Sequence, residues 1–258
     1  MPGPEENNTA AMTVVDSDGS VKAMIQYLAR DNQHKLVKPY YLYLDYDYDL
    51  PSTNTTADEQ FVQIRNARNL GISSREMFSK WGFTQLHLNC SLTPEEYWYN
   101  EKVEKILYPK YKSIAQFLFP NAARVEVLEH AVSKDPKKED LKLLIDRASL
   151  WKPIKGPVYD FPLTLCDRRT VDYESQTTAM DVVTHNFANE NARVYFDEKH
   201  EWYYWHGLQV DEVIAFVQAD SAAENKAGVP HTAFQDPRIN DNKQLRESIE
   251  ARVFVYFD

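Results

Sequence analysis

The sequence has few cysteines, few glycines and a shortage of basic residues. Its two cysteines, Cys90 and Cys166, cannot build a disulfide framework or a four-thiolate zinc site, so a reducing compartment is expected. With 7 glycines there is no phosphate-binding loop, dinucleotide fingerprint or Gly-x-Ser-x-Gly elbow. Cys166 could act as a nucleophile beside Arg168 and Arg169 if its pKa were lowered, but a buried apolar role is more usual for such a thiol.

Positive charge is also scarce. The chain carries 29 Lys and Arg against 39 Asp and Glu, a net charge of −10. Such a chain is poorly suited to a phosphate backbone or an anionic membrane surface, which excludes nucleic acid and membranes as expected partners. No window approaches the ~18 apolar residues of a membrane helix, and the N-terminal sequence has no signal-peptide pattern. We therefore expect a cytoplasmic protein.

Large apolar side chains are abundant. The chain has 258 residues, of which 43% are hydrophobic and 13% aromatic, so it can bury a sizeable core and is not disordered over most of its length. Residues 1–20 are polar and without periodicity, which predicts a flexible tail. Residues 21–258 are predicted to form a single domain, without internal repeats or low-complexity segments.

Residues 21–120 are predicted to be rich in helix. The clearest signal is Thr93 followed by Pro94, which suits a capping residue and the first position of a helix. That helix is expected to run to Pro120, with a kink or break at Pro109. Within the same half, residues 38–51 mix tyrosine with polar residues, which suits a half-buried strand or an extended arm.

The pattern changes from about residue 150 onward. Short apolar runs recur at regular intervals between turn residues, which is typical of a mainly β sandwich or barrel. We expect a jelly-roll core over residues 121–258, with the helical N-terminal half wrapped on it. The predicted strands contain ARVEVLEHAV, SLWKPI, FPLTLCD, ARVYF, EWYYW, DEVIAFVQ, HTAF and SIEARVFVYF.

The last predicted strand has an unusually polar face. Side chains two residues apart share a face of a strand, so Arg246, Ser248, Glu250 and Arg252 should point the same way, fifteen residues or more after His231. A guanidinium with a hydroxyl beside it, inside a barrel, is a good receptor for a dicarboxylate, because the planar fork binds one carboxylate through two hydrogen bonds.

A simpler interpretation of these residues stays open. Arg246 and Arg252 could lie on a solvated face, paired with Glu247 and Glu250, while His231 caps a turn.

Several blocks of sequence resemble a known family. These are WKPIKGPVYDFPLTLCDRRTVD (151–172), HEWYYWHGLQVDEVIAFVQADS (200–221), VPHTAF and RESIEARVFVYF. They are similar to the fungal and bacterial hydroxylase/desaturase family that includes gibberellin desaturase, the asaB-type enzymes and the cephamycin-methoxylase component. The resemblance implies a non-haem iron(II), 2-oxoglutarate-dependent oxygenase on a double-stranded β-helix. It also implies a secondary-metabolism hydroxylase or desaturase whose partner is a small-molecule substrate, a natural-product intermediate.

The resemblance assigns roles to four residues. His231 matches the distal metal-binding histidine, and Arg246 with Ser248 matches the receptor for the 2-oxoglutarate carboxylate. Arg252 is a second candidate for that receptor. Three aromatic residues match the family's blocks, either as barrel core or as pocket lining: Trp151, Tyr203 and Tyr204.

The sequence departs from the family in one respect. An iron(II) facial triad needs two histidines and a carboxylate, the first two arriving as His-x-Asp or His-x-Glu. None of the seven histidines is followed by an acid two positions later, and the connection near residues 133–150 looks shortened. Three explanations are open: a faulty or alternatively spliced transcript, loss of the metal with a retained binding role, or recruitment of other ligands. His130 and Asp135 lie nearest the gap, but a spacing of five residues does not suit two ligands on one strand. The rival to the enzyme is therefore a non-catalytic relative that binds a small molecule or a protein.

Overall fold

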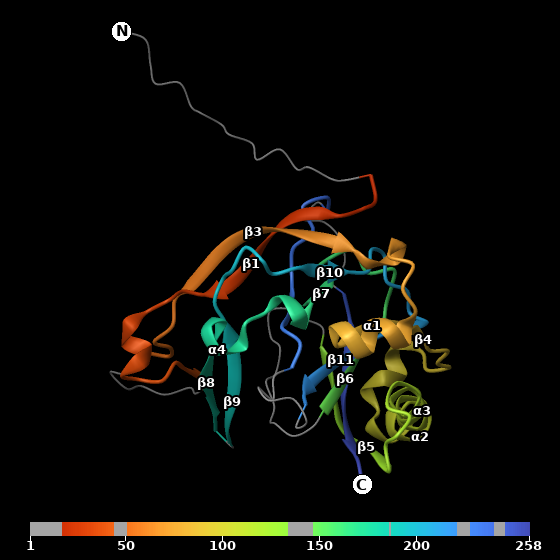
Figure 1. Cartoon of the computed structure of the whole chain (residues 1–258). Coiled ribbons are helices and arrows are strands. Elements are labelled where there is room, and N and C mark those ends of the chain that lie inside the picture. The colour runs from red at the N-terminus through yellow and green to blue at the C-terminus, as the bar shows by residue number, and fades with distance from the viewer. Residues whose placement is uncertain (1–16, 44–50, 134–146, 186, 221–227, 240–245) are drawn as a thin grey trace.

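The computed structural model describes residues 17–43, 51–133, 147–185, 187–220, 228–239 and 246–258. The chain is mainly β, as predicted, with three sheets and a group of helices on one side (Figure 1). Most of the predicted tail at 1–20 and most of the predicted shortening near 133–150 lie outside the described residues. Within the described ranges, no helix is long and apolar enough to cross a membrane.

Sheet I has the strand order β1-β3-β10-β7-β12. Strand β10 runs parallel to β3, while the other neighbours are antiparallel. The side chains of β1 largely alternate between buried and accessible, so one face of the sheet packs inward. The strands are β1 (Val21–Leu28), β3 (Ala57–Asn66), β7 (Leu163–Cys166), β10 (Trp202–Tyr204) and β12 (His231–Ala233).

Sheet II has the order β4-β11-β6-β13-β5, and all its neighbours are antiparallel. The final strand, β13, therefore lies between β6 and β5. The apolar runs predicted as strands after residue 150, and the run ARVEVLEHAV before it, are confirmed here and in the other two sheets. The strands are β4 (Phe83–His87), β5 (Arg124–Ser133), β6 (Arg147–Pro153), β11 (Glu212–Ala219) and β13 (Ser248–Tyr256).

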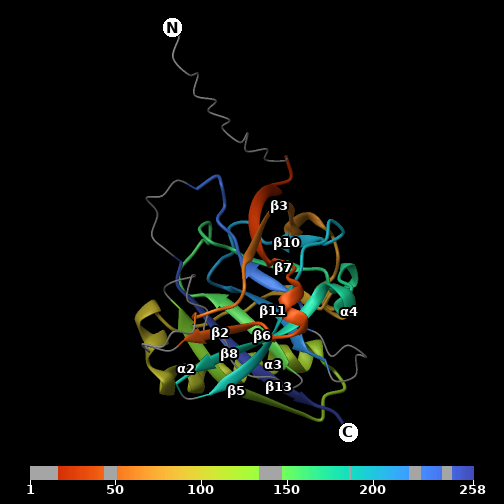
Figure 2. The same cartoon turned by 90° about the vertical axis from the view of Figure 1, so that its left-hand side faces the viewer.

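Sheet III is smaller, with the order β2-β8-β9. It consists of β2 (Tyr40–Tyr43), β8 (Thr177–Thr184) and β9 (Ala188–Val194). Strand β2 confirms the start of the strand predicted at 38–51, and residues 44–50 lie outside the described residues. Sheet III stands to the left of sheet II in Figure 1 and in front of it in the turned view of Figure 2, so the two sheets flank the interior of the molecule.

Helices cover the outer side of sheet II (Figure 1). Thr93 forms a capping box with Glu96, as the Thr-Pro-Glu-Glu pattern predicts, and Pro109 lies in the first turn of a new helix, so the expected break is real. The helices here are α1 (Ser74–Trp81), a 3-10 turn (Pro94–Trp98), α2 (Asn100–Ile106) and α3 (Tyr108–Leu118). Shorter turns lie at Asn32–Lys35, Ala67–Asn69 and Arg168–Thr170, and α4 spans Tyr173–Gln176.

The expectation of a largely helical N-terminal half is met only in part. Residues 21–120 also contain β1, β2, β3 and β4. Strand β3 gains its second neighbour from β10, far along the chain, and β4 gains its neighbour from β11. Such long-range pairing stabilises strands whose local sequence gives only a weak signal.

Candidate functional site

Sheets I and II meet face to face at two aromatic rings. The imidazole of His231 on β12 and the ring of Phe216 on β11 have their centroids 4.5 Å apart. Phe216 is directly opposite Ser149 on β6, and Ser149 is directly opposite Arg252 on β13. Directly opposed residues share a face of an antiparallel sheet, so all three side chains point toward the interior.

The polar face of β13 is therefore the inner face. Ser248, Glu250 and Arg252 alternate along it, as the sequence predicts. Each contacts a polar partner: Ser248 contacts Arg246, Glu250 accepts a hydrogen bond from Ser149 at 2.7 Å, and Arg252 lies 3.2 Å from a carboxylate oxygen of Glu129 on β5.

Arg246 is buried rather than solvated, at 4% exposure, and so is Ser248, at 3%. The guanidinium donates from Nη1 to Ser248 Oγ at 2.8 Å and from Nε to the carbonyl of Phe161, and it lies 4.9 Å from the Trp151 ring centroid. Phe161 has a φ of 39°, a costly conformation for a bulky residue. These contacts fix the plane of the guanidinium.

The alternative of a solvated face is therefore wrong for Arg246, and the pairing it assumed is different. Glu247 is bound by Lys155 at 2.8 Å, while the backbone N–H of Arg246 donates to Asp160 at 2.6 Å. Ser248 accepts a hydrogen bond from Arg246 and keeps its own hydroxyl hydrogen for donation. The pair thus presents a cationic fork and a hydroxyl donor on one buried surface.

One ring nitrogen of His231 forms a hydrogen bond with the backbone. Nδ1 lies 2.8 Å from the carbonyl oxygen of Val229. Because a carbonyl only accepts, Nδ1 must carry the hydrogen, which leaves the lone pair of a neutral ring on Nε2. This is the tautomer that a metal-binding imidazole needs, and a backbone carbonyl is a usual partner for its other nitrogen. The residue lies within β12, not at a turn.

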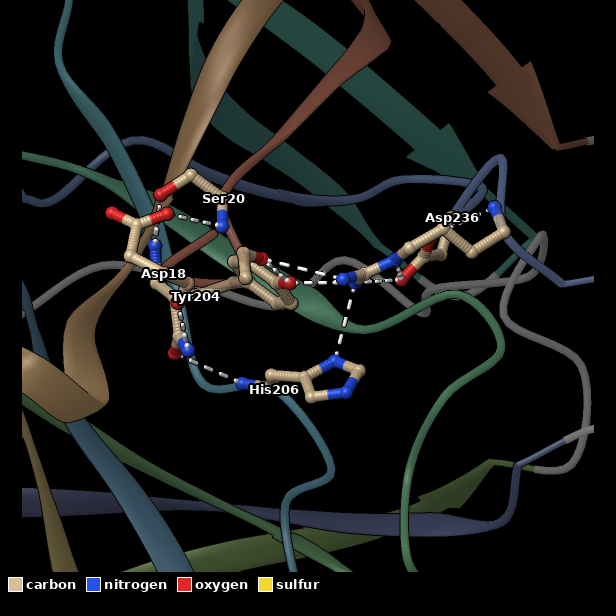
Figure 3. Close-up of polar contacts among 8 residues, drawn as sticks. Asp18, Ser20, Tyr204, His206 and Asp236 are labelled. Atoms are coloured by element: carbon tan, nitrogen blue, oxygen red, sulfur yellow. Dashed lines mark hydrogen bonds and ion pairs between the residues drawn. The ribbon is translucent and has the colours of Figure 1, made fainter. Parts of the chain in front are cut away.

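A polar network secures the chain just beyond β12 (Figure 3). Arg238 forms an ion pair with Asp236 and donates to Tyr204 Oη at 2.6 Å and to His206 Nδ1 at 3.2 Å. Tyr204 Oη in turn donates to the carbonyl of Gly19 at 2.6 Å. The network ties Asp236 and Arg238, which follow His231 in the chain, to β10 and to the residues just before β1.

The three aromatic residues divide between the two roles left open for them. Trp151 lies under the Arg246 guanidinium, on the inner face of sheet II. Tyr203 packs in the main hydrophobic core, and its hydroxyl group donates to Glu201 at 3.0 Å. Tyr204 belongs to the second core and to the network of Figure 3. Trp151 is therefore the one of the three that touches a candidate site residue.

Three inward polar residues were not singled out from the sequence. Ser149 links Glu250 to Gln218, whose Nε2 donates to Ser149 Oγ at 2.9 Å. Glu129 pairs with Arg252. Ser149 and Gln218 lie in apolar runs, and only the strand register reveals that they meet. A signal for Glu129 existed in the alternation of β5, but a bulge opposite Arg252 and Val253 interrupts it.

A complete metal centre is not visible. Among the described residues, no group of three His, Cys, Asp or Glu side chains could hold a metal ion. His130 faces the helices, where its Nδ1 lies 3.0 Å from Tyr108 Oη, and Asp135 lies outside the described residues. Burial raises the pKa of Cys166 to about 12, which does not suit a nucleophile. Among the described residues, His231 therefore lacks the second histidine and the carboxylate that a facial triad would need beside it.

The comparisons with known proteins agree with this architecture. A family model described as an oxidoreductase/YMDC permease-like domain matches residues 137–256. The aspirochlorine biosynthesis protein N of Aspergillus oryzae is 32% identical over 159 residues, covering 58% of this chain and 63% of the relative. The hydroxylase/desaturase asaB of Aspergillus flavus is 28% identical, covering 43% of this chain and 54% of that relative. These relatives confirm the resemblance to the hydroxylase/desaturase family.

A solved structure extends the likeness to nearly the whole chain. A variant of the iron and alpha-ketoglutarate-dependent endoperoxidase NvfI superposes with a TM-score of 0.78, at 18% identity, covering 92% of this chain and 97% of that chain. The Fe(II)/2-oxoglutarate-dependent dioxygenase nvfI of Aspergillus novofumigatus is 27% identical over 52% of this chain and 49% of the relative. The chain has the fold of these oxygenases, and it spans about half to two thirds of the length of these three curated relatives.

Proposed function

We propose that the protein is an oxidoreductase of secondary metabolism, a 2-oxoglutarate-dependent hydroxylase or desaturase that acts on a small natural-product intermediate. The observation that carries the proposal is the buried pair of Arg246 and Ser248 on the inner face of sheet II. Across from this sheet, His231 contacts Phe216 with its Nε2 lone pair available. An anion receptor and an imidazole ligand, placed on two facing sheets, are the two parts of such a site that this chain retains.

The anion receptor is assigned to Arg246 and Ser248. The guanidinium supplies charge-assisted hydrogen bonds to one carboxylate of 2-oxoglutarate, and the hydroxyl supplies one more donor. Arg252 is the weaker candidate because Glu129 already neutralises it. In enzymes of this class, iron(II) with 2-oxoglutarate would supply oxidising chemistry with dioxygen as the oxidant, while the protein orients the substrate and excludes water.

The described residues do not fit an iron centre with three protein ligands, since His231 stands alone. This favours a second candidate function: a non-catalytic relative that keeps the fold and the anion receptor and binds a small molecule or a protein without iron. Both candidate functions use the anion receptor of Arg246 and Ser248. Only the oxygenase also binds iron.

The jelly-roll arrangement of the sheets and the single domain are part of the same proposal. We assign the curled sheets I and II to a double-stranded β-helix, the jelly roll of this enzyme class, and residues 21–258 to a single domain. The facing contact between β11 and β12, and the similarity to NvfI along the chain, support that assignment.

Anaerobic titration of the purified protein with iron(II) and 2-oxoglutarate tests the enzyme. We expect a visible metal-to-ligand charge-transfer band, followed by succinate formation when oxygen is admitted. Arg246→Leu should lose both. Arg252→Leu, the matched control at the second candidate arginine, should retain them. Absence of the band at saturating iron would reject the enzyme and favour the non-catalytic relative.

A further inference from the structure

Strand β9 carries two asparagines on its more buried face. Ala188, Glu190 and Ala192 are exposed, whereas Asn189 is buried and Asn191 is half-buried on the opposite face. A strand at the surface normally turns its small apolar residues inward and its polar residues toward water. The asparagines on the buried face of β9 indicate that this part of sheet III meets a polar group.

The register identifies the inner face. Asn189 is directly opposite Val182, and Asn191 is directly opposite Met180, both of which are buried on β8. Arg193 follows two residues after Asn191, opposite Thr178, so it points to the same side. Because sheet III flanks sheet II in both views, this side faces the interior of the molecule (Figures 1 and 2).

Arg193 differs from the other arginines whose side chains the structure describes. Each of the others donates a hydrogen bond or forms an ion pair within the protein, as Arg246 does with Ser248 and Arg252 does with Glu129. Arg193 is half-buried and has neither among the described residues. Burial lowers its pKa, and the one group that acts in the opposite direction is Tyr43 on β2, not a carboxylate.

A half-buried guanidinium without an anion is costly, because it stays charged at all accessible pH values and loses hydration. The cost is offset when an anion binds. We propose that the inner face of β9, with Arg193 flanked by Asn191, binds a carboxylate of the small-molecule substrate. The planar guanidinium accepts a carboxylate through two hydrogen bonds, and the Asn191 amide adds a donor. The inference rests on the proposed function only in calling that molecule a substrate.

The assignment separates two anion sites. Arg246, two residues before β13, receives the cosubstrate in the proposed function, and Arg193 on β9 of sheet III receives the substrate. The substrate is thereby a small organic acid rather than a neutral molecule. The acidic surface of the chain does not attract such an acid at long range, so its binding depends on this local positive charge.

Binding of phenylacetate and of its neutral analogue phenylacetamide, followed by saturation-transfer NMR without iron or oxygen, tests the site. We expect the acid to bind about tenfold to a hundredfold more tightly than the amide, the range of one charge-assisted pair. Arg193→Leu should abolish that preference and Arg193→Lys should keep part of it. Ala192→Leu, on the exposed face of the same strand, is the matched control and should retain it fully.

Arg246→Leu separates this site from the cosubstrate receptor, because the preference for the acid should survive that change. Equal binding of acid and amide, no binding of either, or loss of the preference in Arg246→Leu would overturn the proposal. A ligand-independent measurement completes the test: Arg193→Leu should melt at the same temperature as the natural chain or higher, and a lower melting temperature would show that Arg193 is paired within the protein. The binding measurement does not depend on succinate formation. The proposed oxygenase activity can therefore be rejected while the proposed substrate site at Arg193 is retained.

Discussion

The Nδ1 atom of His231 lies 2.8 Å from the carbonyl oxygen of Val229, two residues earlier in the chain. This contact determines which ring nitrogen faces the interior with a lone pair. A histidine merely packed against Phe216 would not need a fixed tautomer, whereas a ligand does.

The first prediction concerns this tautomer. In 15N NMR spectra of the neutral ring, Nδ1 of His231 should carry the hydrogen and Nε2 should be bare, because the carbonyl of Val229 accepts from Nδ1. Added Zn²⁺ should then shift the Nε2 signal. His87, which is 74% exposed, serves as the comparison within the same spectrum. A hydrogen on Nε2 of His231 would contradict the geometry.

The second prediction concerns the receptor. Ser248→Ala removes the acceptor of the Arg246 Nη1 hydrogen bond in a buried setting, so the free energy of unfolding should fall by about 1–3 kcal/mol. Urea unfolding measures the change. Ser113→Ala removes an exposed hydroxyl on α3 and should cost far less. An equal effect from the two substitutions would show that the hydroxyl of Ser248 is not needed to hold Arg246.

The polar face of β13 could be predicted because it needs only the two-residue period of one strand. Ser248, Glu250 and Arg252 follow that period, and the structure places them on one inner face. The contacts of this face could not be predicted, because they depend on register between strands far apart in sequence. Ser149 meets Glu250 across a separation of 101 residues, which no local pattern encodes.

The same distinction explains the N-terminal half. The capping box at Thr93 and the break at Pro109 are local signals, and both are confirmed. Strand β3 is different, since β1 and β10 on its two sides stabilise it through tertiary pairing. Arg193 lies within the predicted strand ARVYF, but its surroundings could not be predicted, because they depend on how β9 pairs with β8.

The third prediction concerns the network of Figure 3. The carboxylate of Asp236 is 1% exposed and is bound by Arg238. Arg238→Leu leaves a buried charge without its partner, so the free energy of unfolding should fall by about 3–5 kcal/mol. Adding Asp236→Asn removes that charge and should restore a large part of the loss. Urea unfolding of the single and double variants gives both values.

A surface ion pair provides the control for that experiment. Lys80 and Glu76 on α1 form an exposed pair, and Lys80→Leu should change the free energy of unfolding far less than Arg238→Leu does. A similarly small effect of Arg238→Leu would show that the network does not anchor the chain between β12 and β13.

The fourth prediction concerns stability in mild acid. Burial lowers the pKa of His200, whose Nε2 lies 2.9 Å from Gln176 Oε1 and whose Nδ1 lies 3.3 Å from Tyr27 Oη. Trp202 Nε1 donates to Tyr27 Oη, which leaves the Tyr27 hydroxyl hydrogen for Nδ1 of His200. Nε2 of His200 then carries the ring hydrogen and donates it to Gln176 Oε1. This chain of hydrogen bonds requires a neutral imidazole and is broken when Nδ1 takes a proton.

The sign of the pH dependence follows from the lowered pKa. Above pH about 6.5 the histidine is neutral in both states, so its contribution to stability is complete. As the pH falls below that value, the unfolded chain takes up the proton first, and the free energy of unfolding decreases by up to about 1.4 kcal/mol per pH unit until the folded pKa is reached. Burial lowers the pKa of His206 as well, and the two effects add. Urea unfolding between about pH 7 and pH 5 should show the decrease, and His200→Gln should reduce it. A slope that persists in His200→Gln at its full value would assign the acid sensitivity to other groups.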